Sequence, residues 1–255
     1  MRRAPQLSAY AIPDIPLIQA GDDIIDIMLV KAQAAGIELQ VGDVLVLSSK
    51  IVSKAAGRLI CLADVRASQA AVELAAETDK DPRLVELILS ESDHVSRKRR
   101  GVLVTKHRLG FVSANAGIDQ SNIEGGDDRA LLLPIDPDQA ASSIREQIQA
   151  RLGIVVGVII SDTHGRPFRV GNIGVAIGAA GLPTIQDLRG SRDLYGRTLE
   201  ITQVAYADLV ASAAHLLCGE ADEGLPAVLL RGLDVGGKHG CAADLIRAPE
   251  HDLYR

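Results

Sequence analysis

The sequence predicts an α/β fold of the mixed α+β kind, in which helices flank mixed sheets and the ligand site lies at strand ends. Residues 154–160 are uncharged and mostly Ile and Val, which is typical of a strand buried on both faces. A polar cluster, Ser161-Asp162-Thr163-His164, follows at once. Segments with helical spacing alternate with this and similar runs. An open α/β sheet places its chemistry where such strands end.

Composition limits the class of protein. With 255 residues, 47% hydrophobic and 24% charged, the chain can bury a substantial core as one large domain or two small ones. We treat residues 1–255 as a single unit, with two intertwined subdomains as the alternative. The net charge of −6 argues against a nucleic-acid binder. Aromatic residues make up only 2%, which removes the stacking platforms used to bind single strands.

No stretch fits a leader or a membrane span. The first 18 residues contain three prolines, and no apolar run is long enough to cross a bilayer. The protein is therefore expected to be cytoplasmic, without a membrane partner. Three scattered cysteines, Cys61, Cys218 and Cys241, indicate neither a disulfide framework nor a structural zinc site.

The first elements bring hydroxyls and lysines to the end of a strand. After an extended, proline-containing stretch at 10–18, helical spacing predicts a helix at roughly 22–35, ended by Gly36. Residues 44–49 predict a second buried strand. The polar residues gathered around its end are Ser48, Ser49, Lys50 and Lys54. Such groups can bind phosphate oxygens. The alternative is a strand end whose lysines only face the solvent, which is the commoner situation for any one such residue.

Residues 67–110 predict two helices and a hairpin. Helical spacing over 67–90 is interrupted at Asp81-Pro82, so Pro82 should lie in the first turn of the second helix. The basic run 97–100 could bind an anionic substrate, although a charge run is more often a solvated face. A hairpin is expected around 106–110.

The strand that returns from this hairpin delivers a second carboxylate to a strand end, at 115–122. Gly117 permits a tight turn, so Asp119 and Asn122 could be aimed at one site. Asp119 and Asp162 are both expected in loops.

Two further helices are predicted at 138–153 and 203–218, the second ending at Gly219. His215 inside it is expected to be a packed core residue. The glycines of 171–181 are too irregularly spaced for a dinucleotide fingerprint and suit close backbone packing. An acidic loop, 219–226, leads to a last strand.

Residues 232–238 fit the glycine and lysine spacing of a P-loop. His239 stands where Ser or Thr should ligate magnesium, which argues against one. The tail beyond it predicts a short helix and a frayed end.

The cluster that follows 154–160 carries the strongest chemical signal. A carboxylate, a hydroxyl and an imidazole lie near two guanidiniums, Arg166 and Arg169, which indicates a metal and a phosphate. The alternative is that Asp162 and Thr163 only cap a turn or a helix.

Four segments in register carry a family resemblance. They are DVLVLSSKIVSKAAGR, GFVSANAGIDQSN, SDTHGRPFRVGNIGVAIG and GEADEGLP. In this order and spacing they resemble the coenzyme F420-0:gamma-glutamyl ligases, from about residue 12 to about residue 235. The resemblance implies a gamma-glutamyl ligase-like fold in its free-standing form. Asp14 stands where many relatives have Gly.

The resemblance implies a ligase of coenzyme F420 biosynthesis. GTP, L-glutamate and coenzyme F420-0 would give the glutamylated coenzyme, GDP and phosphate, and further glutamates would be added through the gamma-carboxyl. Mg²⁺ or Mn²⁺, K⁺ as a further ion, and a homodimer belong to the same expectation.

The resemblance also assigns residues by position. The metal ligands would be Asp119, Asp162, Thr163 and Glu220. The GTP-binding set would be Ile15, Pro16, Leu17, Ile18, Ser49, Lys50, Lys54, Asn122, Cys218, Gly219, Glu220, Ala221, Asp222, Glu223, Gly224 and Leu225. Asp119, Asp162 and His164 would be the catalytic residues. His164 would either support a metal ligand or act as a general base toward the glutamate amine.

The chemistry of amide formation fits these residues. A carboxylate must be activated before an amine attacks it, most simply as an acyl phosphate, and charge neutralisation dominates that phosphoryl transfer. Two divalent ions on hard oxygen ligands would supply this charge neutralisation. A metal-dependent phosphohydrolase and a non-catalytic deazaflavin-binding protein are the alternatives.

Overall fold

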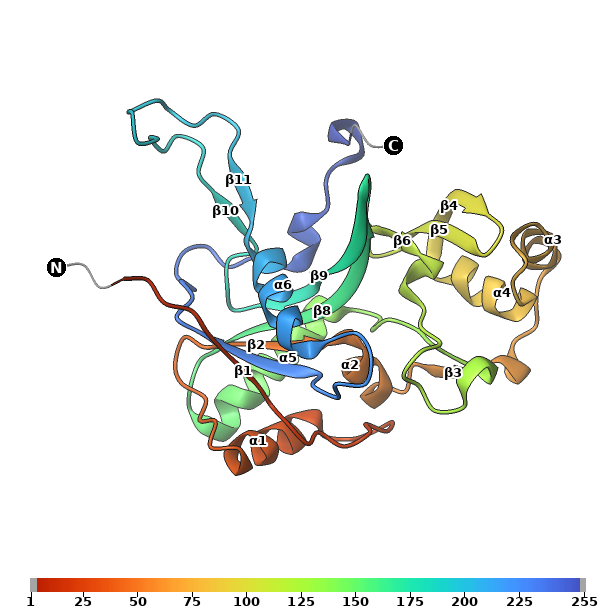
Figure 1. Ribbon diagram of the computed structural model, residues 1–255, viewed down its shortest axis with the longest axis horizontal. Helices are drawn as coiled ribbons and strands as arrows, with labels where there is room; N and C mark the ends of the chain where they lie inside the picture. Colours follow the sequence, from red (N-terminus) through yellow and green to blue (C-terminus); the bar gives the residue numbers. More distant parts are fainter. Residues whose placement is uncertain (1–3, 253–255) are drawn as a thin grey trace.

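A five-stranded mixed sheet forms the centre of the molecule in a computed structural model that describes residues 4–252 (Figure 1). The strand order is β1 (Ser8–Ala11), β12 (Ala227–Arg231), β2 (Val44–Ser48), β8 (Gly157–Arg166) and β9 (Arg169–Ala180). The pair β2 and β8 is parallel, and the other neighbours are antiparallel. The predicted α/β class with mixed sheets is therefore confirmed.

Strand β8 is longer than the sequence indicated. The polar cluster expected in a loop, Ser161 to Arg166, continues the strand and pairs with β9. Pairing with β2 ends at Ser161, and a register shift in the β8–β9 ladder lies between Ile160 and Ser161. The antiparallel partner β9 thus holds the polar half of β8 in an extended conformation after the parallel partner β2 has ended. The periodicity of the β8 segment alone does not reveal this pairing.

Helices cover both faces of the sheet. Helices α1 (Ile24–Ala34), α2 (Ser49–Ala55) and α5 (Pro137–Leu152) share one hydrophobic core with the strands. Helix α6 (Tyr206–Cys218) packs in the core of the opposite face. Alternate residues of β2 point into the two cores, Leu45 and Leu47 into the first and Val44 and Val46 into the second. Burial on both faces explains the uncharged runs in the sequence.

The glycines of β9 allow close packing, as predicted. A Cβ at Gly178 would lie 2.3 Å from the carbonyl oxygen of Pro137 at the start of α5. A Cβ at Gly174 would lie 2.8 Å from the carbonyl oxygen of Ala211 in α6. These two glycines let helices approach the sheet from opposite faces.

A second lobe carries its own core, on the right in Figure 1. It contains α3 (Gln69–Thr78), α4 (Pro82–Ser90), β4 (Ser92–Arg99), β5 (Val102–His107) and β6 (Val112–Ala114), with the ladder of β3 (Leu59–Cys61) and β7 (Arg129–Leu131). Pro82 occupies the first turn of α4, as predicted. The basic run ends β4, where Lys98 pairs with Glu77 and Arg100 with Asp79, both largely exposed. These contacts favour the solvated-face interpretation.

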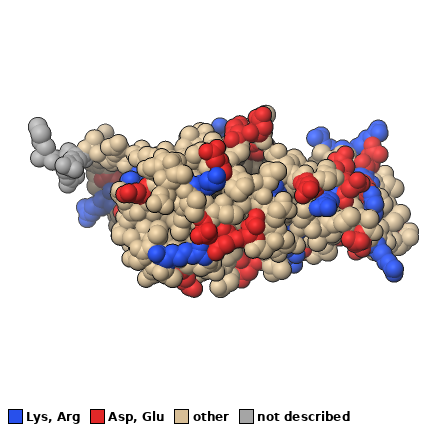
Figure 2. All heavy atoms as spheres, turned by 90° about the horizontal axis from the view of Figure 1, so that it is seen from below, with Lys and Arg blue, Asp and Glu red and all other residues tan. Residues whose placement is uncertain are grey.

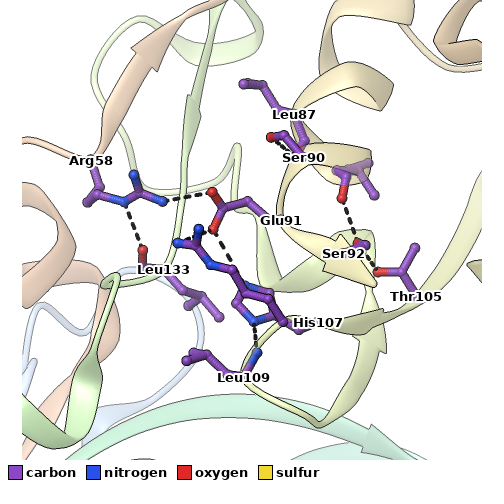
Figure 3. Close-up of polar contacts among 11 residues, drawn as sticks. Arg58, Leu87, Ser90, Glu91, Ser92, Thr105, His107, Leu109 and Leu133 are labelled. Atoms are coloured by element: carbon purple, nitrogen blue, oxygen red, sulfur yellow. Dashed lines mark hydrogen bonds and ion pairs between the residues drawn. The ribbon is translucent and has the colours of Figure 1, made fainter. Parts of the chain in front are cut away.

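Buried Glu91 joins this lobe to the main body (Figure 3). Glu91 is 5% exposed; its carboxylate accepts a hydrogen bond from Arg58 at 3.0 Å and forms an ion pair with Arg108 at 2.9 Å, while Arg58 also donates to the carbonyl of Leu133. Burial alone would raise the pKa of Glu91, but His107 and the two guanidiniums hold it below its ordinary value. One carboxylate therefore ties α4 to the segment that follows α2.

A two-stranded arm leaves the main body between β10 (Ile185–Asp187) and β11 (Gln203–Ala205) (Figure 1). Residues 203–205, expected in a helix, are a strand because they pair with β10, and the helix begins at Tyr206. The tail forms two 3-10 turns, Ala242–Leu245 and Pro249–His251, instead of the expected helix. Further 3-10 turns lie at Leu62–Asp64, Asn115–Gly117 and Gly126–Asp128. Within residues 4–252 no helix is long and apolar enough to span a membrane.

Charged residues are interspersed on the face drawn in Figure 2. Lysine and arginine do not gather there into a continuous basic surface.

Candidate functional site

A cavity of about 840 Å³ lies where β2, β8 and α2 meet the end of α6. Ligand pockets of this size hold drug-sized molecules and nucleotides. Most of the residues that the sequence analysis selected line it. These are Ile15, Pro16, Leu17, Ile18, Lys50, Lys54, Asn122, Asp162, Thr163, Cys218, Gly219, Glu220, Ala221, Asp222, Glu223, Gly224 and Leu225.

Helix α2 sets the positions of the two lysines. The residues after β2 turn directly into this helix, with Ser48 as N-cap, so Ser49, which was expected in the strand, begins the helix. Lys50 and Lys54 are four residues apart and so share one helix face, toward the cavity. Burial and the neighbouring charge of Lys50 lower the pKa of Lys54. Its ammonium donates to the carbonyl of Asn122 at 2.8 Å.

Asp162 projects into the cavity from β8, within a strand and not from the expected loop. Its Oδ1 accepts from the hydroxyl of Ser49 at 3.2 Å, and its Oδ2 lies 3.2 Å from Nε2 of His164. Ser49 and His164 do not line the cavity. They contact the Asp162 carboxylate from within the protein, and the Asp162 side chain is only 11% exposed.

Asp119 approaches from the second lobe, and its backbone bridges to Leu131. It is not among the residues that line the cavity. Gly117, at φ of 66°, permits the turn that precedes it, as predicted. The carboxylate forms an ion pair with the ammonium of Lys50. Burial raises the pKa of Asp119 despite Lys50, and the charges of Asp162 and Glu220 add to the rise. Three carboxylates from distant segments therefore influence one another at this site.

The acidic loop after α6 forms the opposite wall. Gly219, at φ of 69°, lets the chain fold back so tightly that a Cβ there would lie 2.0 Å from the carboxyl carbon of Glu223. Asn122 donates to the carbonyl of Ala221 at 2.9 Å, which links this loop to the second lobe. Burial and the charge of Glu220 raise the pKa of the Cys218 thiol to about 11, so it stays protonated.

His215 is a cavity residue that sequence reasoning assigned to the core. Its Nε2 lies 2.6 Å from Oε1 of Glu220, and its side chain is only partly buried. The expectation of a packed core histidine is wrong, because the last turn of α6 faces the acidic loop. The available signal was the position of His215, one helical turn before Gly219.

His164 stands against aromatic neighbours on its other side. Its ring is 4.7 Å from that of Phe111 and tilted by 50°. The ring of Phe111 in turn stacks on buried His107 at 5.0 Å. These contacts fix the imidazole beside Asp162, which favours a supporting role over a free general base.

The turn that leads to residues 15–18 contains Asp14, at φ of 57°. This left-handed region favours glycine and tolerates aspartate better than most other residues. The physical requirement explains why Asp14 can stand where glycine is common.

The oxygen ligands expected for a metal, Asp119, Asp162, Thr163 and Glu220, converge here without a preformed cage. In the described part of the chain, no three His, Cys, Asp or Glu side chains form a group that could hold a metal ion. Their hard oxygens, and the negative charges of Asp162 and Glu220 near buried Asp119, fit a divalent cation of the Mg²⁺ type.

Comparisons with known proteins give a consistent result. The family model described as F420-0:Gamma-glutamyl ligase matches residues 13–232. A coenzyme F420:L-glutamate ligase of Methanothermobacter thermautotrophicus is 46% identical, over 98% of this chain and 99% of the relative. One of Methanopyrus kandleri is 45% identical over 98% of each chain. One of Archaeoglobus fulgidus is 41% identical, over 98% of this chain and 97% of the relative.

Proposed function

The chain belongs to the F420-0:gamma-glutamyl ligase family, and we propose that it joins L-glutamate to coenzyme F420-0 at the expense of GTP. The names of its relatives, coenzyme F420:L-glutamate ligase, support the substrates. The observation that carries the proposal is the cavity, in which two lysines face acidic side chains from three distant parts of the chain. Further glutamates would be added through the gamma-carboxyl.

The reaction has two steps. A carboxylate oxygen of coenzyme F420-0 attacks the γ-phosphorus of GTP, and the bond to the leaving GDP oxygen breaks. The glutamate amine then attacks the acyl carbon of this acyl phosphate, the carbon–oxygen bond to phosphate breaks, and the amine releases a proton. Both steps depend on positioning and on neutralising phosphate charge.

The chain's own residues supply much of that neutralisation. Lys50 and Lys54 share one face of α2 and would bind the phosphates as cations. Residues 15–18 and 218–225 would enclose the nucleotide. The imidazole of His164 would keep the Asp162 carboxylate in its orientation.

Asp119, Asp162, Thr163 and Glu220 would hold divalent ions, Mg²⁺ or Mn²⁺, with two as the expected number and K⁺ as a further ion. Bound there, such ions would offset the charge that develops on the phosphates. The oxygen-only donor set supports this choice.

The product of the reaction tests the proposal. Coenzyme F420-0, L-glutamate, GTP and Mn²⁺ are incubated with the protein, and mass spectrometry records the deazaflavin while GDP is measured in parallel. The expected result is a product heavier by one or more glutamyl residues, with GDP release that requires both acceptor and glutamate. Equal GTP hydrolysis without them would point to a phosphohydrolase instead. Binding of the deazaflavin without any turnover would point to a carrier.

A further inference from the structure

Arg129 is a cavity residue that the family resemblance does not assign. It begins β7 and lines the cavity beside Asn122, Ile123 and Glu124. Within residues 4–252 its guanidinium has no ion pair and no hydrogen bond, whereas its backbone carbonyl accepts from Gln120. The guanidinium is thus a charge without a counterion.

The other cations of the cavity are already engaged. Lys50 is paired with Asp119, and Lys54 donates to a backbone carbonyl. Arg129 remains unpaired although acidic residues are close in sequence, at Glu124, Asp127 and Asp128. The absence of an ion pair at Arg129 is therefore not due to a lack of acidic residues nearby in the chain.

Backbone contacts and a neighbouring glycine set the position of this side chain. The amide of Gln120 donates to the carbonyls of Asp127 and Arg129, at 3.2 and 3.4 Å, and the β3–β7 ladder pairs Arg129 with Cys61. Gly125, at φ of 89°, leaves room for the stem, since a Cβ there would lie 3.0 Å from Cδ and Nε of Arg129. The backbone on both sides of the arginine is fixed, and its stem packs over a glycine.

We propose that Arg129 binds an oxyanion of the ligands in this cavity, either a carboxylate of the incoming glutamate or a phosphate of the nucleotide. A guanidinium offers two parallel N–H donors that match either group, in a geometry that lysine does not reproduce. The inference rests on the proposed function, because it takes its ligands from that reaction.

Three variants test it: Arg129→Gln, Arg129→Lys and the control Arg99→Gln, an exposed arginine of β4 far from the cavity. The KM for glutamate and kcat are measured by ligation, and the Kd for GTP by calorimetry without turnover. Arg129→Gln should raise either the KM for glutamate or the Kd for GTP by about tenfold or more, as loss of a charge-assisted pair does. Arg129→Lys should give a smaller increase, and Arg99→Gln none.

The outcomes separate the two sources of the oxyanion. A higher KM for glutamate with unchanged GTP affinity assigns Arg129 to the amino acid, and weaker GTP binding assigns it to the nucleotide. If both constants stay within twofold in a folded Arg129→Gln protein, the inference is wrong. A wild-type protein that forms no glutamylated product contradicts the proposed function, whereas the calorimetric comparison still tests Arg129.

Discussion

At the scale of single residues, the three carboxylates expected to bind metal each have a partner from the chain. The pairs are Asp119 with Lys50, Asp162 with Ser49 and His164, and Glu220 with His215. These contacts keep the acidic groups oriented in the protein without ligands. A bound metal ion or phosphate would therefore replace these partners, and would not bind to a cluster of unpaired negative charges.

Replacing Asp162 or Asp119 should stop ligation without unfolding the protein. Asp162→Asn and Asp119→Asn preserve side-chain volume but remove the charge that metal and phosphate chemistry requires, so kcat should fall by more than about 100-fold. Circular dichroism should show an unchanged fold, and Asp187→Asn, on exposed β10, serves as control. A folded variant that ligates at the wild-type rate removes that aspartate from the site.

Lys54 should affect nucleotide binding more than turnover. Because burial and Lys50 lower its pKa, its ammonium loses its proton at a lower pH than an ordinary lysine. GTP affinity should therefore decline as pH rises toward the ordinary lysine pKa of about 10.4, and Lys54→Arg should resist that decline because arginine stays protonated. Lys54→Ala should weaken GTP binding by about tenfold at neutral pH. Identical pH dependence of the Kd in wild type and Lys54→Arg would exclude this role.

At the scale of elements, short connections place the site. Helix α2 is only seven residues long, yet its immediate start after β2 turns two lysines toward the cavity, where Lys50 pairs with Asp119 and Lys54 donates to Asn122. Arg58, just beyond α2, is held by Glu91 of the second lobe. The lysine helix and the lobe that supplies Asp119 are therefore fixed to each other through one buried carboxylate (Figure 3).

Glu91→Gln should destabilise the protein by about 2 kcal/mol at neutral pH, because it leaves the partly buried Arg58 and the more exposed Arg108 without their buried counterion. The pKa of Glu91 is lowered in the fold, so its contribution is present above the unfolded pKa of about 4.3. That contribution is lost as pH falls through the folded pKa. Urea unfolding at several pH values should show that the difference in free energy of unfolding between the variant and the wild type becomes smaller below about pH 4. Glu77→Gln, at an exposed pair with Lys98, should cost less than about 0.5 kcal/mol. A difference that does not vary with pH would contradict this account.

At the scale of the whole molecule, the β10–β11 arm extends away from the main body (Figure 1). Leu194 and Tyr195 near its end are 101% and 97% exposed. Exposed apolar groups on a projecting arm are typical of association surfaces. They are consistent with the homodimer that the family resemblance implies, which remains a prediction.

The double variant Leu194→Ser, Tyr195→Ser should shift the protein from dimer to monomer in sedimentation at micromolar concentration, since it removes apolar area from the proposed contact. The control Val41→Ser changes an exposed apolar residue of the main body and should leave the dimer intact. A wild-type protein that sediments as a monomer would refute the homodimer, and a dimeric double variant would place the contact elsewhere.

The sequence by itself determined the local structure. Uncharged runs identified β2, β8 and β12, helical spacing with caps identified α1 and α3 to α6, and glycines marked the close approach of helices to β9. These features depend on neighbours within a few residues, where side-chain period and capping chemistry act directly. Whether the chain forms one unit or two subdomains stays a prediction.

Only the tertiary structure decided which polar residues meet. Parallel pairing of β2 with β8, residues more than a hundred positions apart, brings Ser49 against Asp162, and the β3–β7 ladder brings Asp119 to Lys50. Arg129 became a site residue only through such long-range contacts, whereas His215 meets Glu220 only five residues further along the chain. Periodicity reports the burial of a segment, but the partner that covers it depends on the path of the whole chain.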